Sequence, residues 1–247
     1  MRVDSKESER RKQPDRYERE SVEFARAFTF LDAVYAFSLT LLVVNVDPPE
    51  PAAWSDLGSL LASGLGTQLL GFAVSFVVIA VFWRVNHRIV GGLHAVTPSV
   101  LTANLVAIAF VVLIPFTTQG ISDQATADEP LAIALYAVDI SAAVIAQSSV
   151  ALLAQRDGVV RDPLPPRALA VRLADTMTTP LVFLASIPVA YLADAGWARV
   201  VWLSLIVIGP VSGRIADRRI ARILREVHGA PGAHGEGKHG PPPGASG

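Results

Sequence analysis

The stretch "FARAFTFLDAVYAFSLTLLVVNV", from Phe24 to Val46, decides the fold class of this chain. Most of it is apolar, and a helix needs roughly 20 mostly apolar residues to cross the hydrocarbon layer of a bilayer. It nevertheless carries Arg26 near its start and Asp32 about two turns further along. Charges inside a membrane-spanning helix are costly, so each of them needs a partner, a watery surrounding or a function.

The composition of the whole chain also indicates a membrane protein. Of its 247 residues, 51% are hydrophobic and 17% are charged, which is too apolar for an ordinary soluble domain. The absence of cysteine excludes disulfides, thiolate metal sites and a cysteine nucleophile. No HExxH, GxSxG or P-loop pattern occurs. We therefore expect no enzymatic activity, no cofactor or bound metal, and no nucleic-acid partner.

Six stretches are long and apolar enough to cross a bilayer. They lie at approximately 28–46, 65–85, 100–118, 131–153, 168–192 and 197–215. The sequence thus predicts an all-α integral membrane protein with six transmembrane helices. We expect three parts, which are a basic cytoplasmic tail (1–25), a six-helix membrane domain (26–227) and a disordered Gly/Pro-rich cytoplasmic tail (228–247).

The charges between these stretches predict the orientation of the chain. The N-terminal tail, the second and fourth loops and the C-terminal flank are rich in arginine, whereas the first and third loops carry only acidic charges. The fifth loop has one charge of each sign, Asp194 and Arg199. Because basic loops stay on the cytoplasmic side, this alternation predicts a multi-pass plasma-membrane protein with both termini in the cytoplasm.

Helical geometry separates Asp32 from an apolar stripe on the first helix. At 100° per residue, Phe37, Leu41 and Val44 fall on one stripe, together with Ala33 and Thr40. Asp32 lies about 140° from Phe37 and should point toward another helix.

The second span offers polar partners for Asp32 at the same level of the membrane. These are Trp83, Asn86 and His87, since an indole N–H or an imidazole nitrogen can bind a carboxylate. The alternative is that Trp83 is a boundary aromatic and His87 a loop residue.

Two further carboxylates lie within predicted spans. Asp139 lies midway along the fourth span and is a candidate intramembrane proton site. Asn104, Ser141 and Gln147 are its candidate partners. Asp175 lies about two turns into the fifth span, where we expect it to pair with Arg172 three residues earlier.

Three motifs resemble the transmembrane protein 175 family of cation channels in its bacterial six-span form. In the first helix, "RAFTFLDAVYAFSLTLLVV" places Arg26, Phe30 and Asp32 like the family's Arg, Phe and Asp, with Leu31 in place of a serine. In the second, "SFVVIAVFWRVNHRIV" resembles the helix that carries the family's Trp and His, at Trp83 and His87. In the third, "LVAIAFVVLIPFTT" ends in Ile-Pro-Phe, as the family's third helix does.

The resemblance implies a homotetramer in which the first helices line a central pore. It places Phe37 at the pore constriction, where relatives carry a branched aliphatic residue, and Leu41 and Val44 at the next apolar positions. Thr40 matches a threonine ring linked to preference for potassium. Arg26, Phe30, Asp32, Trp83 and His87 then correspond to a motif network between helices one and two.

The function that follows is a potassium-permeable cation channel without a TVGYG filter, gated by an apolar constriction on helix one. Its partners would be other copies of the chain, the bilayer and permeating monovalent cations. Two alternatives stay open, a proton-coupled secondary transporter that uses Asp32, Asp139 and Asp175, and a non-conducting scaffold of the same fold. The first is disfavoured by the lack of a convincing internal repeat.

Overall fold

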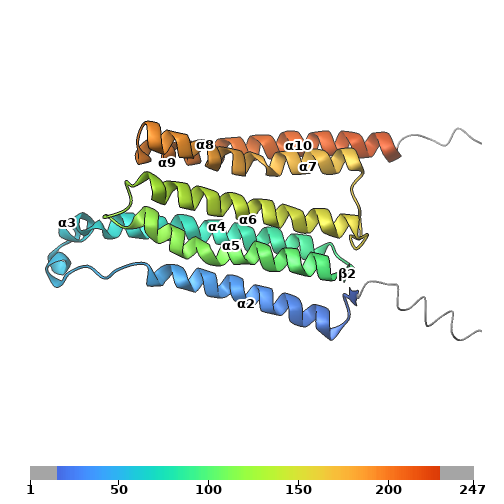
Figure 1. The fold of residues 1–247 in the computed structure, drawn as a ribbon, viewed down its shortest axis with the longest axis horizontal. Helices are drawn as coiled ribbons and strands as arrows, with labels where there is room; N and C mark the ends of the chain where they lie inside the picture. The colour runs from blue at the N-terminus through green and yellow to red at the C-terminus, as the bar shows by residue number, and fades with distance from the viewer. Residues whose placement is uncertain (1–15, 229–247) are drawn as a thin grey trace, which may run out of the picture.

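The computed structural model of the protein describes residues 16–228. Most of the predicted N-terminal tail and the predicted disorder of 229–247 therefore lie outside the described residues. Within them the chain is almost entirely helical, and its helices run lengthwise in one bundle (Figure 1). This confirms the predicted all-α fold class.

Short strands and turns link the long helices. The elements in chain order are β1 (Tyr17–Glu18), α2 (Val22–Val44), the 3-10 helix η1 (Pro51–Ser55), α3 (Leu57–Leu60), the π-helical turn η2 (Leu61–Leu65), α4 (Gly66–Gly91), β2 (Ala95–Val96), α5 (Pro98–Ser122), α6 (Pro130–Arg156), α7 (Pro166–Thr176), α8 (Thr178–Leu192), α9 (Ala195–Leu203) and α10 (Leu205–His228).

Six helical segments among the described residues are long and apolar enough to cross a membrane. They are Val22–Val44, Leu57–Gly91, Pro98–Ser122, Pro130–Arg156, Pro166–Leu192 and Ala195–Val227. Each overlaps one predicted span, which confirms the six-helix prediction. Several run past the apolar limits read from the sequence, because a helix continues for as long as its backbone hydrogen bonds are made, whether or not its side chains are apolar.

Side-chain caps explain where several helices begin. The Ser21 side chain accepts a hydrogen bond from the backbone N–H of Phe24 and so caps α2. Thr97 caps α5 in the same way, and Pro98 follows at the first helical position, where its missing N–H costs nothing. Asp194 caps α9 by accepting from the N–H of Trp197.

The fifth span is interrupted, although not where its prolines alone would predict. The span contains Pro180 and Pro188, and a proline inside a helix usually kinks it, but the break lies at Met177, between α7 and α8. Pro180 lies in the first turn of α8, where a missing N–H breaks no helical hydrogen bond, and Pro188 stays inside that helix. In a continuous helix Pro180 would face the carbonyl of Thr176, four residues earlier, to which it cannot donate and against which its ring clashes, so α7 ends at Thr176.

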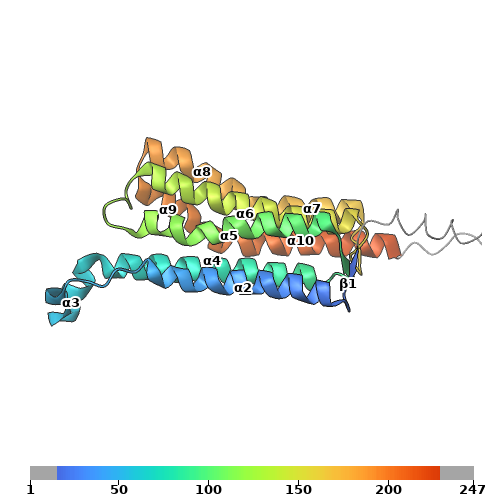
Figure 2. The same cartoon turned by 60° about the horizontal axis from the view of Figure 1, so that its bottom comes forward.

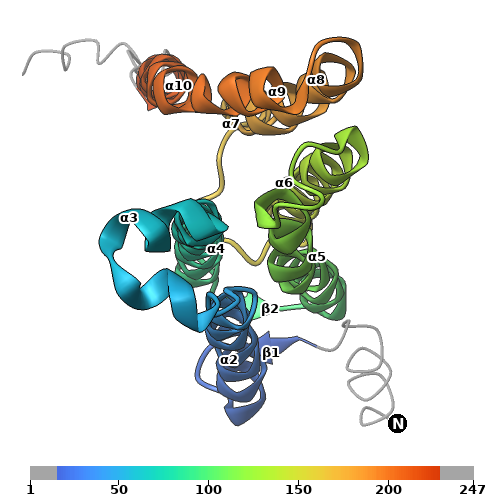
Figure 3. The same cartoon turned by 90° about the vertical axis from the view of Figure 1, so that its left-hand side faces the viewer.

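The bundle has a central pair of helices and more exposed helices around it. α5 and α6 make the most extensive contact of any two elements, α2 and α4 pack against α5, and α8 packs against α6. Figures 1 and 3 show α2 and α10 on opposite sides of the bundle, and Figure 2 shows α2 running alongside α4. Fully buried side chains from α4, α5 and α6, such as Ile79, Ile114 and Tyr136, fill the core between the helices.

One end of the bundle gathers the arginine-rich segments. The end of α4, the end of α6, the start of α7 and the end of α10 all lie there, together with β1 (Figure 1). We call this the basic end. There β1 pairs antiparallel with β2, and the Arg19 guanidinium donates to the carbonyls of Val90, Gly91 and Leu93 at 3.1–3.3 Å. The start of α2 is thus tied to the loop after α4.

Candidate functional site

Helix α2 has two faces of different character. One face packs into the subunit through its buried residues, Phe24, Phe28, Leu31, Tyr35, Ser38 and Leu42. The other face is exposed and carries Arg26, Phe30, Ala33, Phe37, Thr40 and Val44. Both sets repeat at intervals of four and three residues, which is the period of a helix that packs against a partner along its length.

The exposed face carries most of the residues predicted for the pore. Phe37 is 59% exposed and Val44 is 71% exposed within one subunit. Leu41 is half-buried and lies at the edge of this face. The Thr40 hydroxyl donates to the carbonyl of Phe37 at 2.8 Å, which leaves its oxygen lone pairs free to accept.

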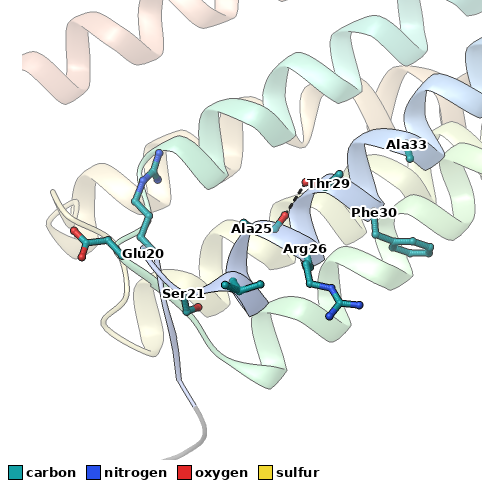
Figure 4. A pocket seen from close by; sticks show the side chains of 9 residues that line it. Glu20, Ser21, Ala25, Arg26, Thr29, Phe30 and Ala33 are labelled. Carbon is teal, nitrogen blue, oxygen red and sulfur yellow. Dashed lines mark hydrogen bonds between the residues drawn. The ribbon is translucent and has the colours of Figure 1, made fainter.

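Arg26 and Phe30 lie on this exposed face near the basic end. Figure 4 shows both side chains leaving the same side of α2, beside a shallow groove that also touches Thr29 and Ala33. Among residues 16–228, Arg26 has no hydrogen-bond or ion-pair partner. A single subunit therefore does not bring Arg26 and Phe30 to the rest of the predicted motif network, and their part in it stays a prediction.

The structure brings the other three motif residues together. Asp32 Oδ1 accepts a hydrogen bond from Trp83 Nε1 at 3.0 Å, across the contact between α2 and α4. The Trp83 ring packs against the His87 ring, with ring centroids 5.5 Å apart and the ring planes tilted by 34°. Asp32 thus points sideways toward the second span, away from the Phe37 stripe. The indole is the hydrogen-bond donor, so Trp83 has a partner within the protein. His87 lies inside α4, so the alternative that places it in a loop is wrong.

Leu31 stands where the family motif has a serine. Its side chain is 1% exposed and belongs to the main hydrophobic core, beside Tyr35 and Phe28. A hydroxyl at this position would need a buried partner, whereas leucine adds apolar contact. In this chain the position therefore contributes packing between α2 and its neighbours.

Asp139 is buried between α5 and α6, but none of its predicted partners holds it. Its Oδ2 accepts a hydrogen bond from Thr117 Oγ1 at 2.9 Å, while Oδ1 has no partner among the described residues. Asn104, Ser141 and Gln147 all donate to backbone carbonyls instead, so their prediction as partners was wrong. Thr117 lies on the adjacent helix at the same depth, a match that depends on the register between helices.

The predicted pair of Arg172 and Asp175 does not form. Arg172 Nη2 lies 3.0 Å from Asp217 Oδ1 on α10, and the Oδ1 of Asp175 is buried without a hydrogen-bond partner in the described part of the chain. Sequence spacing favoured the neighbour on the same helix, but the packing of α7 against α10 supplies a better-placed carboxylate. The ion pair therefore joins two spans.

Polar contacts between the helices near the end of α5 were also not predicted from the sequence. Thr118 Oγ1 donates to Ser75 Oγ at 2.7 Å, and Ser75 Oγ lies 3.4 Å from the Tyr136 hydroxyl, so a polar chain links α5, α4 and α6. The Asn45 side chain, at the end of α2, donates to the carbonyl of Pro115. The adjacent threonines at the end of the third span were the signal that a polar layer lies at this depth.

The family comparison agrees with this geometry. The family model described as endosomal/lysosomal potassium channel TMEM175 matches residues 26–115. The chain resembles the TMEM175 family. The matched range contains Arg26, Asp32, Trp83 and Pro115 and spans α2, α4 and most of α5, which confirms the resemblance read from the motifs.

Two curated relatives carry related descriptions. A potassium channel of Chryseobacterium sp. (strain P1-3) is 28% identical over 107 residues, which is 43% of this chain and 53% of the relative. A potassium channel of Streptomyces collinus (strain DSM 40733 / Tue 365) is 27% identical over 158 residues, or 61% of this chain and 75% of the relative. The chain thus aligns with about half of the first relative's length.

A solved structure shares the fold. The crystal structure of a lysosomal potassium-selective channel TMEM175 homologue from Chamaesiphon minutus superposes with a TM-score of 0.58 at 22% identity. The match covers 80% of this chain and 98% of the other. The protein is therefore a multi-pass, all-α membrane protein with the TMEM175 fold.

Proposed function

We propose that this protein is a potassium-permeable cation channel of the plasma membrane, assembled from four copies around the exposed face of α2. Both termini would lie in the cytoplasm, with the basic end facing inward. The proposal is supported by the similarity to potassium channels and, above all, by one observation. The first helix presents an unpaired stripe of Phe37, Thr40 and Val44, spaced as a helix packing surface, on the side away from its own subunit.

The division of α2 into two faces supports a role in assembly. Its buried face is fixed by the subunit core, and the bond between Asp32 and Trp83 sets its rotation about the helix axis. The exposed stripe is then held in one orientation. Four such stripes meeting at a common axis would enclose a bore lined by the same side chains at each level.

The chemistry of the stripe suits a pore closed by apolar side chains. Rings of Phe37 and, further along, Val44 would narrow the bore and expel water, so that an ion could not pass with its hydration shell. Widening by a small movement of α2 would readmit water. Gating here would thus depend on the diameter of an apolar ring.

Thr40 supplies the polar level between these apolar rings. Its hydroxyl hydrogen is engaged by the carbonyl of Phe37, so four Thr40 oxygens would face a passing cation with their lone pairs. A hydroxyl ring replaces only part of the hydration shell, and we expect a modest preference for potassium over sodium.

Acidic residues lie at the end of the bundle opposite the basic end. Asp56 is exposed, and hydrogen bonds from Ser59 hold the pKa of its carboxyl below the ordinary value, so it is ionised at neutral pH. Asp47 is also exposed there. Negative charge at this mouth would raise the local concentration of cations before they enter.

The deciding experiment is flux through purified protein in liposomes with potassium, sodium and protons in turn. We expect potassium flux that rises linearly with the potassium gradient and is not coupled to the transport of a second ion. Flux that saturates and requires a second ion would indicate a secondary transporter instead. Absence of flux in both the natural chain and the variant below would indicate a scaffold.

The variant Phe37→Ala tests the constriction itself. Removing four phenyl rings should widen the apolar level and raise potassium leak by roughly tenfold or more. The matched control is Phe76→Ala, which removes another exposed phenyl ring from α4, outside the α2 stripe, and should leave flux unchanged. Equal flux in the two variants would place Phe37 outside the pore.

A further inference from the structure

Helix α10 carries an arginine stripe that the proposed channel does not use. Arg214, Arg218, Arg222 and Arg225 are all exposed and are spaced by four, four and three residues. At 100° per residue they lie within about 80° of one another around the helix. They thus form one continuous basic face about 16 Å long.

The same face of α10 is apolar nearer the middle of the span. Val207 and Val211 are 66% and 47% exposed, and they fall within the same arc as the arginines. Of the six candidate spans, Ala195–Val227 is the least buried, with 6% of its apolar window inside the subunit. Figure 3 shows α10 on the side of the bundle away from α2. Its outward face is therefore placed to contact lipid.

The length of the last span places Arg214 and Arg218 at the edge of the hydrocarbon layer. The stretch from Ala195 to Gly213 rises about 28 Å along the helices, close to the roughly 30 Å thickness of the hydrocarbon layer. Arg214 and Arg218 then come directly after that edge, at the depth of the lipid phosphates. Arg222 and Arg225 lie within one to two further turns.

The acidic residues of α10 do not neutralise this face. Asp217 points toward α7, where it pairs with Arg172 at 3.0 Å. Glu226 is the other acidic residue of the helix and lies in its last described turn. Four arginines face outward with one carboxylate near their end, so the face has a net positive charge.

We propose that this face of α10 binds the headgroups of anionic phospholipids in the leaflet at the basic end. A guanidinium offers paired N–H donors that match two phosphate oxygens, and burying the adjacent valines among acyl chains would hold the headgroup beside it. This interaction does not depend on whether the chain conducts ions. It would anchor the last span against the leaflet and fix the depth of the bundle.

The test uses the absence of cysteine in the natural chain. Ala221→Cys places one exposed thiol beside the stripe, and a neutral fluorophore attached to it reports the lipids nearby. In vesicles of matched composition, quenching by spin-labelled phosphatidylglycerol is compared with quenching by spin-labelled phosphatidylcholine. We expect roughly fivefold stronger quenching by the anionic lipid.

Two sets of arginine variants assign that preference to the stripe. Replacing Arg214, Arg218, Arg222 and Arg225 by glutamine should bring the quenching ratio close to one, whereas replacing them by lysine should retain most of it. The matched control replaces by glutamine four exposed arginines of the basic end outside α10. These are Arg84, Arg156, Arg161 and Arg167, and their replacement should leave the quenching ratio unchanged.

The labelled Ala221→Cys chain, with its arginines intact, tests the proposal even if the glutamine variant does not insert. Raising salt from about 0.05 M to about 0.5 M should lower the ratio severalfold, because screening weakens exposed charge contacts. A ratio near one at low salt would overturn the proposal and leave the arginines as determinants of orientation alone. The proposal would also be overturned if replacing the four control arginines lowered the quenching ratio as much as replacing the four arginines of α10. The proposal would also be wrong if a soluble acidic peptide lowered the quenching by spin-labelled phosphatidylglycerol and unlabelled anionic lipid did not.

Discussion

The first span and the central pair of spans look alike in sequence and differ in the structure. The mean hydropathy of the most apolar window is 1.9 for Val22–Val44, between 2.3 for Pro98–Ser122 and 1.7 for Pro130–Arg156. Yet 22% of that window is buried in the first span, against 50% in each of the other two. Hydropathy therefore identifies a membrane span and does not say whether its neighbours are protein or lipid.

The difference in burial indicates that α2 and the pair α5 and α6 have different roles in the subunit. α5 and α6 hold the buried polar groups Thr117 and Asp139 and the largest fully buried side chain, Tyr136, so they stabilise the subunit. α2 is held along one face and leaves the other free. We infer that substitutions in the central pair act on stability, whereas substitutions on the outer stripe of α2 act on flux.

The largest expected effect is that of Tyr136→Ala. Tyr136 is 1% exposed and its ring lies 5.2 Å from Trp202 and 6.1 Å from Phe183. Removing it should destabilise the subunit by about 3 kcal/mol or more. Unfolding in detergent micelles, followed by tryptophan fluorescence, measures this change.

Phe37→Ala is the comparison for that measurement, because it removes a ring from the exposed face of α2. It should change unfolding of the dissociated subunit by less than about 1 kcal/mol. If the two variants were equally destabilising, the proposed separation between a stabilising pair and an outward-facing first helix would be wrong.

A smaller effect is expected where α2 attaches to α4. Trp83→Phe removes the hydrogen bond to Asp32 and should cost about 1 kcal/mol. Asp32→Asn keeps an acceptor oxygen and should cost less. A double-mutant cycle with Asp32→Ala should give a coupling of about 1 kcal/mol.

Trp197→Phe is the control for the Trp83 variant. Trp197 is 62% exposed, and its indole N–H has no hydrogen-bond partner among the described residues. Its replacement should change stability little. Zero coupling between Asp32 and Trp83 would show that their contact does not hold α2 in place.

The smallest effect concerns pH at the basic end of the central pair. Asp157, just after α6, accepts hydrogen bonds from Ser99 and Thr97 at the start of α5, and these bonds hold its pKa below the ordinary value. A lowered pKa stabilises the folded state above the unfolded value of about 3.9. That stability is lost as the pH falls through the lower, folded-state pKa.

Comparing the natural chain with Asp157→Asn isolates this contribution. The natural chain should be the more stable of the two at pH 7, and the difference should shrink as the pH falls below about 4. Thermal unfolding at a series of pH values measures it. A difference that stays constant down to the lowest pH would show that ionisation of Asp157 does not strengthen the link between α5 and α6.

Parts of the candidate site were predictable because they depend on one helix at a time. That Phe37, Thr40 and Val44 share one face of the helix follows from the helical period alone, as does the separation of Asp32 from that face. The partner of Asp32 was narrowed to Trp83 and its neighbours because both lie near the same boundary of the membrane. Trp83, Asn86 and His87 all lie near that boundary, and the sequence alone did not decide which of them binds Asp32.

Contacts between distant spans were not predictable in this way. Sequence spacing favoured Asp175 for Arg172, but the structure pairs Arg172 with Asp217, 45 positions further along the chain. Asp139 likewise pairs with Thr117, 22 positions earlier. Each choice depends on the rotation and the lengthwise register of two packed helices.

By itself the sequence determined that this chain crosses a membrane six times, which of its ends carry basic charge, and which residues of the first span share a face. These properties follow from transfer free energies and helical geometry, which act over windows of about 20 residues. Only the tertiary structure decided which stripe of α2 is buried, which buried polar groups meet, and that the arginine face of α10 points outward. Those outcomes depend on how side chains from several helices fill the same space, which no local pattern specifies.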